Sequence, residues 1–457
     1  MPLSIKQRII KAFEKILFFR LILFALLLFR KDIRKNSSRK TEIAATLFNY
    51  FIKAVHNQIL FFVLGIANII RERHSVLRIR KFFVSRIPCY KPFYYQIALP
   101  VNLEKADEKY FLNRDYFISK PLLLKTINNC HVFLATEFGI VFKKLHILSD
   151  SIHGKLDKRN IKILKSYTEM VFENYISNKF RKDGNIIQAN DPQNYLLIHH
   201  WFNYYHWITE TLYRYFSLPE EDSKKYTLVL PETLKESKFV NETLLTFSNV
   251  KTEYFPNNSI IGFKHINYIT HKRYCTHYEP TVLHKIRAHF TNYIQKHQTE
   301  APVKSKRLFI SRRQAERRSI VNEEALIEKL QRYGFTAIDF EDYTFLEQVS
   351  IMQHCRCLAG VHGSGITNML FMPEGGSIIE LMPQPEVSKT HHSLVYWRLA
   401  GCLKHKYYYY FCKKKSANNM AAYSHRKYYY NTELHTFHLE VDIIEFEKQL
   451  TNILSLE

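Results

Sequence analysis

The segment LLIHHWFNYYHWITETLYRYF, residues 196–216, can bring a histidine and a carboxylate together if it is helical. His206 and Glu210 are four residues apart, and residues at that spacing lie on one face of a helix. A carboxylate beside an imidazole orients the ring and raises its basicity, which suits a general base acting on a hydroxyl group. Two alternatives are a packed aromatic helix with a satisfied histidine, and a metal site in which His199 and His200 join the pair. The spacing matches no zinc pattern such as HExxH, so we expect no metal.

A second candidate is the glycine-rich stretch AGVHGSGITNMLFMPEGG, residues 359–376, which holds five of the chain's 12 glycines. A strand is predicted before this loop and a helix beginning near Ile366 after it. Backbone N–H groups at the start of a helix favour phosphate, and the loop side chains add donors. The stretch therefore fits either a structural turn or a phosphate-binding loop made by His362, Gly363, Ser364 and Gly365. It is not the dinucleotide fingerprint, since a third glycine is missing, and the chain has no GxxxxGKS/T motif.

Four arginines follow the predicted strand KRLFISR, in the sequence LFISRRQAERRSIVNEE. Arginine at the carboxyl end of such a strand can grip a diphosphate with two parallel hydrogen bonds, which lysine cannot do. Arg312 ends the strand, so we expect it to contact a ligand. For Arg313 and Arg318 a solvated basic face is an equally good interpretation.

The elements that would position these residues alternate between strand and helix over residues 306–383. This alternation predicts a parallel, doubly wound sheet, and ligands of such sheets bind at the carboxyl ends of the strands. Upstream, the runs HVFLATE, YLLIHH and YTLVLPE predict strands, with helices beginning near Trp201 and Pro280. A polar break is expected at residues 297–306, strands at the tyrosine runs 407–410 and 428–430, and a final helix at EVDIIEFEKQLTNIL.

These motifs carry a family resemblance. The order SRR, RR, NEE, FLEQ and GVHGSGITNMLFMPEGGSIIEL resembles the conserved half of glycosyltransferase family 61, and NYYHWITETLYR is similar to that family's NxxHWxxE/D motif. The resemblance implies an α/β fold of GT-B type, with two Rossmann-like, doubly wound halves facing a cleft. It also implies an inverting, metal-independent transferase that uses a nucleotide sugar, most simply a UDP-sugar, in bacterial capsular or other surface polysaccharide synthesis. The chain departs from the family in its long basic N-terminal arm, and in Glu210 where many relatives have Asp.

The resemblance also implies roles for individual residues. Arg312 and Arg317 would bind the donor's diphosphate with the loop at residues 362–365, and His206 or Glu210 would take the proton from the acceptor hydroxyl. Residues that would contact the nucleotide or support the loops are Asn322, Glu347, Gln348, Asn368 and Glu380. For Asn322 a helix cap is an equal alternative, and Asn368 is either a ligand contact or a cap. Glu380, expected at a strand end, could accept hydrogen bonds from ribose hydroxyls.

Charge is concentrated at the start of the chain. Residues 1–90 hold 18 basic residues against 4 acidic ones, a net charge of +14 out of +24 for all 457 residues. The apolar run at residues 21–29 is shorter than the roughly 20 residues that span a bilayer. Apolar runs between basic residues favour peripheral association with an anionic membrane surface, over a buried arm or a signal sequence. Seven scattered cysteines without a CxxC pair fit the cytoplasm, so we expect a location on the inner face of the membrane.

The expected organisation is a basic, partly apolar helical extension, an acceptor-side Rossmann-like domain, a nucleotide-sugar-binding domain and C-terminal strands with a closing helix, at residues 1–90, 91–300, 301–400 and 401–457. Acceptors would be a glycan or a lipid-linked saccharide. A non-catalytic glycan- or nucleotide-binding relative is the alternative. A nucleic-acid-binding protein is favoured only by charge, because no RNA-binding fingerprint is present. A serine hydrolase is unsupported, because the chain has no GxSxG motif.

Overall fold

The computed structural model divides the chain into two compact units, residues 1–82 and 83–457. It describes residues 83–457 apart from 120, 137, 144–145, 149–150, 152–185, 191–193, 199–202, 220, 222–223, 273–274, 314–317, 385–393, 417–436 and 456–457. The basic N-terminal arm up to residue 82 and the tyrosine run 428–430 therefore lie outside the described residues. Within the described part of the chain, no helix combines the length and apolar character needed to cross a bilayer.

The first sheet of the second unit is mixed rather than parallel throughout. Its order is β10-β9-β8-β11-β4-β5-β6, with β1 paired to β4 and β7 to β11. Strands β10, β9, β8 and β11 run parallel, whereas β11, β4, β5 and β6 are antiparallel neighbours. A four-residue connection joins β4 to β5, and connections that short join antiparallel strands. The strands are β1 Phe83–Pro88, β4 Leu123–Leu134, β5 Gly139–Lys143, β6 His146–Ile147, β7 Ile187–Gln188, β8 Tyr195–Leu197, β9 Thr227–Pro231, β10 Lys251–Phe255 and β11 Ser259–Ile269. The fully doubly wound half expected here is thus only partly present.

The second sheet has the order β13-β12-β14-β15-β16-β17, and every pair is parallel except β16–β17. The parallel sheet predicted for residues 306–383 is confirmed. The strand predicted at residues 407–410 belongs to the same sheet, as part of β16. The strands are β12 Arg307–Ile310, β13 Thr336–Ile338, β14 Cys357–Val361, β15 Ser377–Pro383, β16 Lys406–Ser416 and β17 Phe437–Glu440.

The described helices are mostly short. The helix predicted near Trp201 begins at Tyr204 and contains a π-helical segment, Trp207–Leu212, between α5 and α6. The helix predicted after the glycine loop is a 3₁₀ helix, Ser364–Phe371, which starts two residues earlier than expected. The α-helices are α3 Glu108–Phe111, α5 Tyr204–His206, α6 Tyr213–Phe216, α8 Lys238–Leu245, α9 Pro280–Lys296, α10 Glu323–Arg332, α11 Phe345–His354, α13 Val395–Cys402 and α14 Ile443–Ser455. Further 3₁₀ helices are Lys105–Asp107, Glu232–Glu236 and Phe340–Asp342, and β2 Phe93–Gln96 pairs with β3 Tyr116–Ser119.

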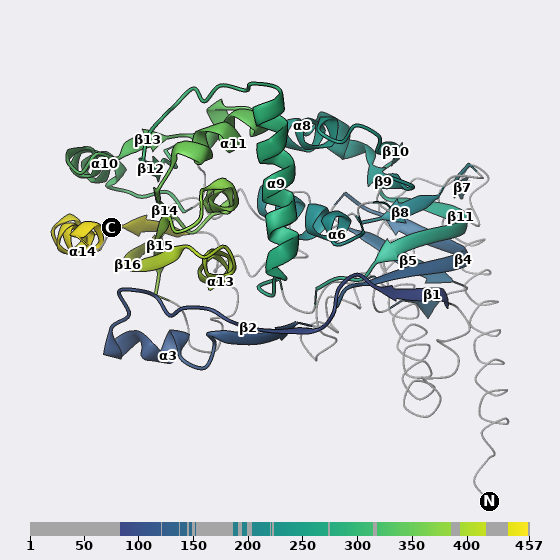
Figure 1. Ribbon diagram of the computed structural model, residues 1–457, viewed down its shortest axis with the longest axis horizontal. Coiled ribbons are helices and arrows are strands. Elements are labelled where there is room, and N and C mark those ends of the chain that lie inside the picture. The colour runs from purple at the N-terminus through teal and green to yellow at the C-terminus, as the bar shows by residue number, and fades with distance from the viewer. Residues whose placement is uncertain are drawn as a thin grey trace, which may run out of the picture. The chain divides into compact units, whose positions relative to one another are not determined.

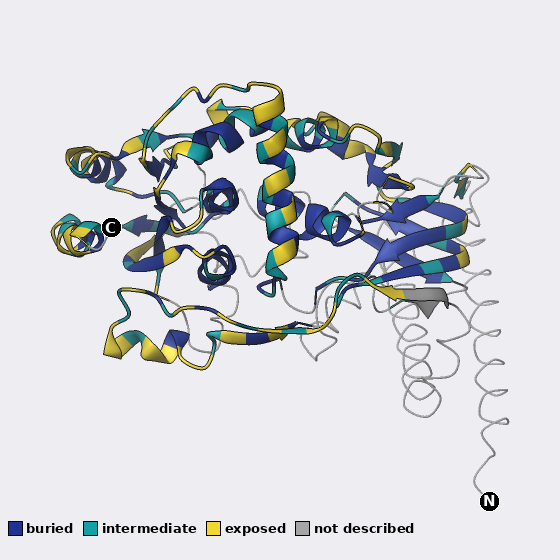
Figure 2. Ribbon diagram, in the orientation of Figure 1, coloured by how far each residue is buried: buried dark blue, intermediate teal, exposed yellow. Residues whose placement is uncertain are grey.

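Helix α9 connects the two sheets. It begins at Pro280, and the Glu279 side chain accepts a hydrogen bond from the N–H of Val282, as an N-cap does. Its buried residues recur at helical spacing, while the opposite face is exposed (Figure 2). The buried face contacts α6, which packs near the first sheet, and α11 with the 3₁₀ helix Ser364–Phe371, which flank the second (Figure 1). One hydrophobic cluster therefore contains Leu228 of β9 as well as Leu308 of β12.

Candidate active site

The predicted histidine–carboxylate pair is formed. The Nδ1 atom of His206, the last residue of α5, lies 2.7 Å from Oε2 of Glu210 in the π-helical segment. Asn203 begins the helix, and its side chain accepts a hydrogen bond from the N–H of His206. The His206 side chain is 17% exposed and that of Glu210 only 4%. The imidazole is thus the part of the pair that a substrate could reach, and the carboxylate lies behind it.

Two buried cations accompany Glu210. Arg214, one turn later, donates to the carbonyls of Ile198, Ile269 and Glu210. Burial lowers the pKa of Arg214 to about 9, and the Glu210 carboxylate acts in the opposite direction. Burial likewise lowers the pKa of Lys272 to about 8, again opposed by Glu210. Buried charges are costly unless they are compensated, so this carboxylate and its two cations stabilise one another.

A second histidine–carboxylate pair lies at the glycine loop. Glu380 pairs in register with Gly360 on one side and with Tyr409 on the other. Side chains two residues apart on a strand share a face, which places His362 and Tyr407 on the same face as Glu380. The Nδ1 atom of His362 bonds one carboxylate oxygen of Glu380, and the Tyr407 hydroxyl donates to the other.

Glu380 therefore lies in the middle of β15, and not at a strand end as the sequence predicts. Its side chain is fully buried and both oxygens bond protein groups, whereas the His362 side chain is 22% exposed. Burial, followed by the charge of Glu380, raises the pKa of Tyr407 well above its usual range. This arrangement orients the His362 imidazole, which is the group that can meet a ligand.

The arginines lie against the same loop. Arg312 donates its backbone N–H to the carboxylate of Glu323 at 2.9 Å and its Nε to the carbonyl of Arg318 at 3.2 Å. Arg318 in turn donates Nη1 to the carbonyl of His362 at 2.7 Å. Its φ of 56° is in the left-handed region, which costs a non-glycine residue about 1 kcal/mol. Arg318 is half-buried and Arg313 is exposed, so the solvated-face interpretation suits Arg313 but not Arg318.

The glycines of the loop allow protein groups to approach the backbone. A Cβ atom on Gly363 would lie 2.7 Å from Nη1 of Arg312, although its φ of −174° suits any residue. A Cβ atom on Gly360 or Gly365 would lie 3.1 or 3.2 Å from the Ile310 side chain. The close approach of the Arg312 and Ile310 side chains thus explains why Gly360, Gly363 and Gly365 lack a side chain, without any ligand being present.

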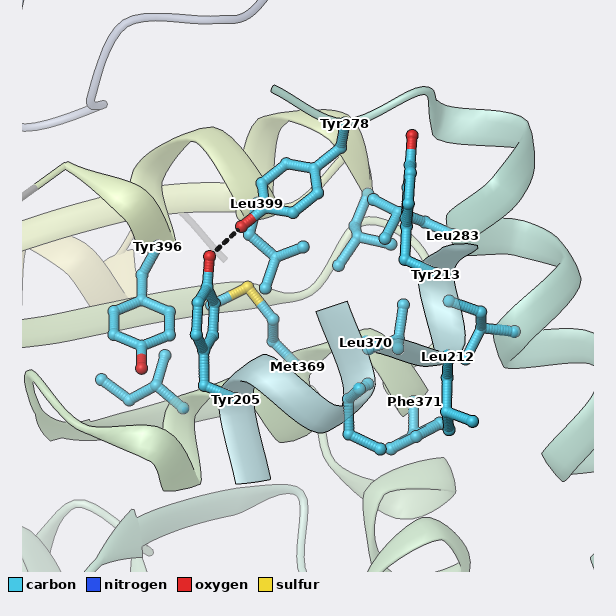
Figure 3. Packing of buried hydrophobic residues seen from close by; sticks show 14 of the residues in the cluster. Tyr205, Leu212, Tyr213, Tyr278, Leu283, Met369, Leu370, Phe371, Tyr396 and Leu399 are labelled. Atoms are coloured by element: carbon cyan, nitrogen blue, oxygen red, sulfur yellow. Dashed lines mark hydrogen bonds between the residues drawn. The ribbon is translucent and has the colours of Figure 1, made fainter. Parts of the chain in front are cut away.

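Aromatic rings join the two histidine pairs. The Tyr205 ring centroid lies 5.0 Å from that of His206 and 5.8 Å from that of Tyr396, which in turn lies 5.0 Å from His362. Figure 3 shows Tyr205 between Tyr396 and Tyr278, whose hydroxyl shares a hydrogen bond with that of Tyr205. Arg312 and Arg318 act electrostatically on Tyr396, although burial remains the main reason why its pKa is raised. Residues far apart in sequence thus form one region with an imidazole at each end.

The remaining predicted residues have structural partners. The Asn368 side chain is fully buried; it accepts from the Tyr204 hydroxyl and donates to Oε1 of Gln348 at 3.0 Å. Gln348 also donates to two carbonyls in residues 340–343, so it supports the loops around it. Asn322 precedes α10 without a side-chain cap hydrogen bond, and instead pairs with both backbone groups of Val441.

Glu347 forms a capping box with Thr344 at the start of α11. Ser364 begins the 3₁₀ helix beside Gly363. Arg317, His199 and His200 lie outside the described residues. Among the residues that are described, no group of three or more His, Cys, Asp or Glu side chains is placed to hold a metal ion.

Residues of this region that the sequence did not reveal include Lys272, Tyr396 and Tyr407. Tyr407 was expected only as part of a strand, and neither Lys272 nor Tyr396 lies in a motif. Their contacts in this region join residues 27 to 63 positions apart, so no local spacing could reveal them. Only the tyrosine run on a predicted strand was a usable signal for Tyr407.

Part of this region is similar to a family of known proteins. Residues 204–379 match the family described as Glycosyltransferase 61. The match contains His206, Arg312 and His362, and it ends one residue before Glu380.

The chain is also similar to named transferases. The chain is 33% identical over 105 residues to the EGF domain-specific O-linked N-acetylglucosamine transferase of Xenopus laevis, covering 22% of the chain and 18% of the relative. It is 33% identical over 76 residues to the Drosophila melanogaster protein of that name, covering 16% and 14%. It is 33% identical over 69 residues to the Mus musculus Protein O-linked-mannose beta-1,4-N-acetylglucosaminyltransferase 2, covering 14% and 12%. The chain thus spans less than a fifth of the length of these relatives.

Proposed function

We propose that the protein is an inverting glycosyltransferase that moves a sugar from a nucleotide-sugar donor to a hydroxyl group of a glycan acceptor. The observation that carries the proposal is the grouping of the His206–Glu210 pair with the cationic loop around His362, inside the segment that matches Glycosyltransferase 61. The proposed arrangement is of GT-B type, with the second sheet holding the donor.

His206 is the proposed general base. Its Nε2 takes the proton of the acceptor hydroxyl while that oxygen forms a bond to the anomeric carbon. The bond from the anomeric carbon to the diphosphate oxygen breaks in the same displacement, so the configuration inverts. Glu210 is buried and bonded to Nδ1, which supports an orienting role for the carboxylate rather than direct contact with the acceptor.

The leaving diphosphate gains negative charge, and cationic groups beside it stabilise that charge. Arg312 and Arg318 are the proposed contacts, with the His362 imidazole and the N–H groups of Gly363 to Gly365. Arg317 stays a proposed contact from its position in the sequence. These groups can stabilise the leaving diphosphate without a divalent metal ion. We therefore expect transfer to continue when a chelator is present.

The acceptor has two candidate classes. The resemblance of the sequence favours a saccharide of a surface polysaccharide, at a membrane to which the basic arm binds. The names of the relatives favour transfer of N-acetylglucosamine to an EGF domain or to O-linked mannose. The names also make UDP-N-acetylglucosamine the first donor to test.

The test uses the full chain with UDP-N-acetylglucosamine and other UDP-sugars, with and without EDTA. Donor binding is measured by calorimetry, and transfer by mass spectrometry on three acceptors: an EGF-domain polypeptide, an O-mannosylated peptide and a lipid-linked saccharide. We expect Arg312→Ala to weaken donor binding at least tenfold. His206→Ala should leave donor binding unchanged and lower kcat by about 10²- to 10⁴-fold, the usual contribution of a general base.

The controls decide between the candidates. A folded protein that binds no donor would support the non-catalytic alternative. Transfer with His206→Ala at the wild-type rate would remove His206 from the proposed role, while leaving the donor site in place. The acceptor that becomes modified identifies the class of acceptor, which is a polypeptide, a glycopeptide or a lipid-linked saccharide.

A further inference from the structure

Lys272 is buried at a place that hydrophobic packing alone does not explain. Lys272 follows β11 in the sequence, and its Nζ donates hydrogen bonds to the carbonyls of Thr209 and Cys275, both at 3.0 Å. The ammonium lies 4.0 Å from the ring centroid of Tyr278 and 4.7 Å from that of Tyr213. Thr209 precedes Glu210, so Lys272 lies against the π-helical segment beside the carboxylate.

The imidazole and the two cations around Glu210 come from two segments. His206 and Arg214 belong to the same helical segment, and Lys272 belongs to the segment after β11. The neutral titratable groups that interact with Glu210 are Tyr205, Cys275 and Tyr278, and burial raises the pKa of each of them. Arg398 acts on Cys275 from α13, one step further away. Among these described groups, Glu210 is the only carboxylic acid, and its charge favours the charged form of Lys272 more than that of any other neighbour.

We propose that Lys272 is a positioning residue for the His206–Glu210 pair. Its charge keeps Glu210 ionised inside the protein, so that the carboxylate accepts the Nδ1–H of His206 and fixes that tautomer. The nitrogen without a proton is then Nε2, which is the one that can act as a base. The inference rests on the proposed function, because it assigns a role within the same site.

The physical reason is that an isolated buried carboxylate tends to take up a proton. A protonated Glu210 can donate as well as accept, so it no longer selects one tautomer of the imidazole. Proton uptake by Glu210 makes the active combination, a neutral imidazole on a carboxylate, harder to reach at low pH.

The first test needs no substrate. The ring ¹⁵N resonances of histidine-labelled full-length protein are recorded at pH 7, where Lys272 is mostly charged, and His206→Ala assigns the signal of His206. We expect the Nδ1–H tautomer in the wild type and a mixture of tautomers in Lys272→Met. The matched control is Lys125→Met, which removes another buried lysine near a tyrosine ring, that of Tyr268, and should leave the His206 signal unchanged.

The second test is the pH dependence of kcat, once a donor and acceptor are in hand. We expect the acid limb in Lys272→Met to move up by about one pH unit, since a nearby charge typically shifts a titration by one to three units. Lys272→Arg keeps the charge, so its acid limb should stay within a few tenths of a unit of the wild type. Thermal unfolding is measured alongside, because a purely structural lysine would lower the unfolding temperature without moving the limb.

The outcomes separate the inference from the proposed function. An Nε2–H tautomer in the wild type overturns the inference, even if the Lys272→Met variant does not fold. An unchanged His206 signal and an unchanged acid limb in a folded Lys272→Met protein also overturn it, and leave the transferase intact. If the tautomer behaves as expected but no acceptor is ever modified, the proposed function fails while the electrostatic role of Lys272 stands.

Discussion

At the scale of single residues, the loop glycines differ in what a methyl group would meet. A Cβ atom on Gly363 would meet the guanidinium of Arg312, the movable end of a long side chain. Gly375 has open space around it but a φ of +79°, a conformation that other residues adopt only with strain. Gly363 therefore leaves room for the Arg312 side chain, whereas Gly375 allows the turn between the 3₁₀ helix Ser364–Phe371 and β15.

Substituting the two glycines should separate function from stability. We expect Gly363→Ala to displace Arg312 and weaken binding of the donor, or of UDP alone, by roughly tenfold (about 1.4 kcal/mol) with little change in stability. Gly375→Ala should lower the free energy of unfolding by about 1 kcal/mol and leave UDP binding unchanged. Calorimetry and urea unfolding measure the two effects. Equal loss of UDP affinity in both variants would show that Gly363 has no special relation to Arg312.

At the scale of elements, helix α11 shows how a candidate ligand contact can be a cap. Thr344 accepts a hydrogen bond from the N–H of Glu347, whose carboxylate accepts from the N–H and hydroxyl of Thr344. The two residues satisfy each other's backbone groups at the start of the helix. Gln348, one residue later, accepts a hydrogen bond from the side chain of Asn368, which lies in the 3₁₀ helix Ser364–Phe371. Adjacent residues of one motif thus serve different elements.

Removal of the cap tests this assignment. Because an N-cap contributes about 1 kcal/mol, we expect Thr344→Ala and Glu347→Ala each to lower the free energy of unfolding by that amount. Neither should change the affinity for UDP, since both side chains are used at the helix start. Urea unfolding and calorimetry are again the measurements. A large fall in UDP affinity with Glu347→Ala alone would instead make Glu347 a nucleotide contact.

At the scale of the whole molecule, buried titratable groups couple stability to pH. Burial raises the pKa of the Cys130 thiol to about 12, and does the same for Cys275 and Cys412. An unfolded thiol has a pKa near 8.5. From about pH 8.5 to 12 the unfolded chain therefore loses protons that the folded chain retains, so stability falls as pH rises. Below that window both states hold the proton and the contribution is complete.

Replacing one thiol should flatten this dependence. We expect the slope of unfolding free energy against pH, between pH 9 and 11, to become shallower by about 1.4 kcal/mol per pH unit in Cys130→Ala. Urea unfolding under reducing conditions gives the slope. The control is Cys89→Ala, at a half-buried thiol. Burial raises the pKa of Cys89, but hydrogen bonds with Ser217 and Leu124 lower it, so the change in slope should be smaller. The lowered pKa of Lys272 makes stability rise with pH over part of this range, but this contribution is the same in the wild type and in the cysteine variants.

The N-terminal charge is also a property of the whole chain. Neutralising four basic residues that follow the first apolar run, by Arg30→Gln, Lys31→Gln, Arg34→Gln and Lys35→Gln, should weaken binding to phosphatidylserine vesicles at least tenfold. Each basic residue near an anionic leaflet contributes about 1 kcal/mol, and the effect should disappear at high salt. Vesicle sedimentation measures it. The control neutralises four exposed lysines outside the arm, which are Lys304, Lys306, Lys413 and Lys414. Equal effects of both sets would point to overall charge rather than to the arm.

The sequence by itself determined whatever depends on local spacing. The His206–Glu210 pair is four residues apart on one helix, so its contact follows from helical geometry. The alternation over residues 306–383 required long crossovers, and these make parallel strands. The connection from β4 to β5 is too short for a crossover and so indicates antiparallel strands. The prediction of a doubly wound sheet for residues 91–300 did not take this connection into account.

Only the tertiary structure decided the contacts between distant segments. Glu380 is assigned to His362 and Tyr407 by the register of three neighbouring strands, and that register is set by packing of the whole sheet. Lys272 lies against the segment that carries Glu210 because one hydrophobic core holds both segments. A buried charge is stable only beside a compensating one, and no pattern of neighbouring residues in the chain records which distant group will compensate it.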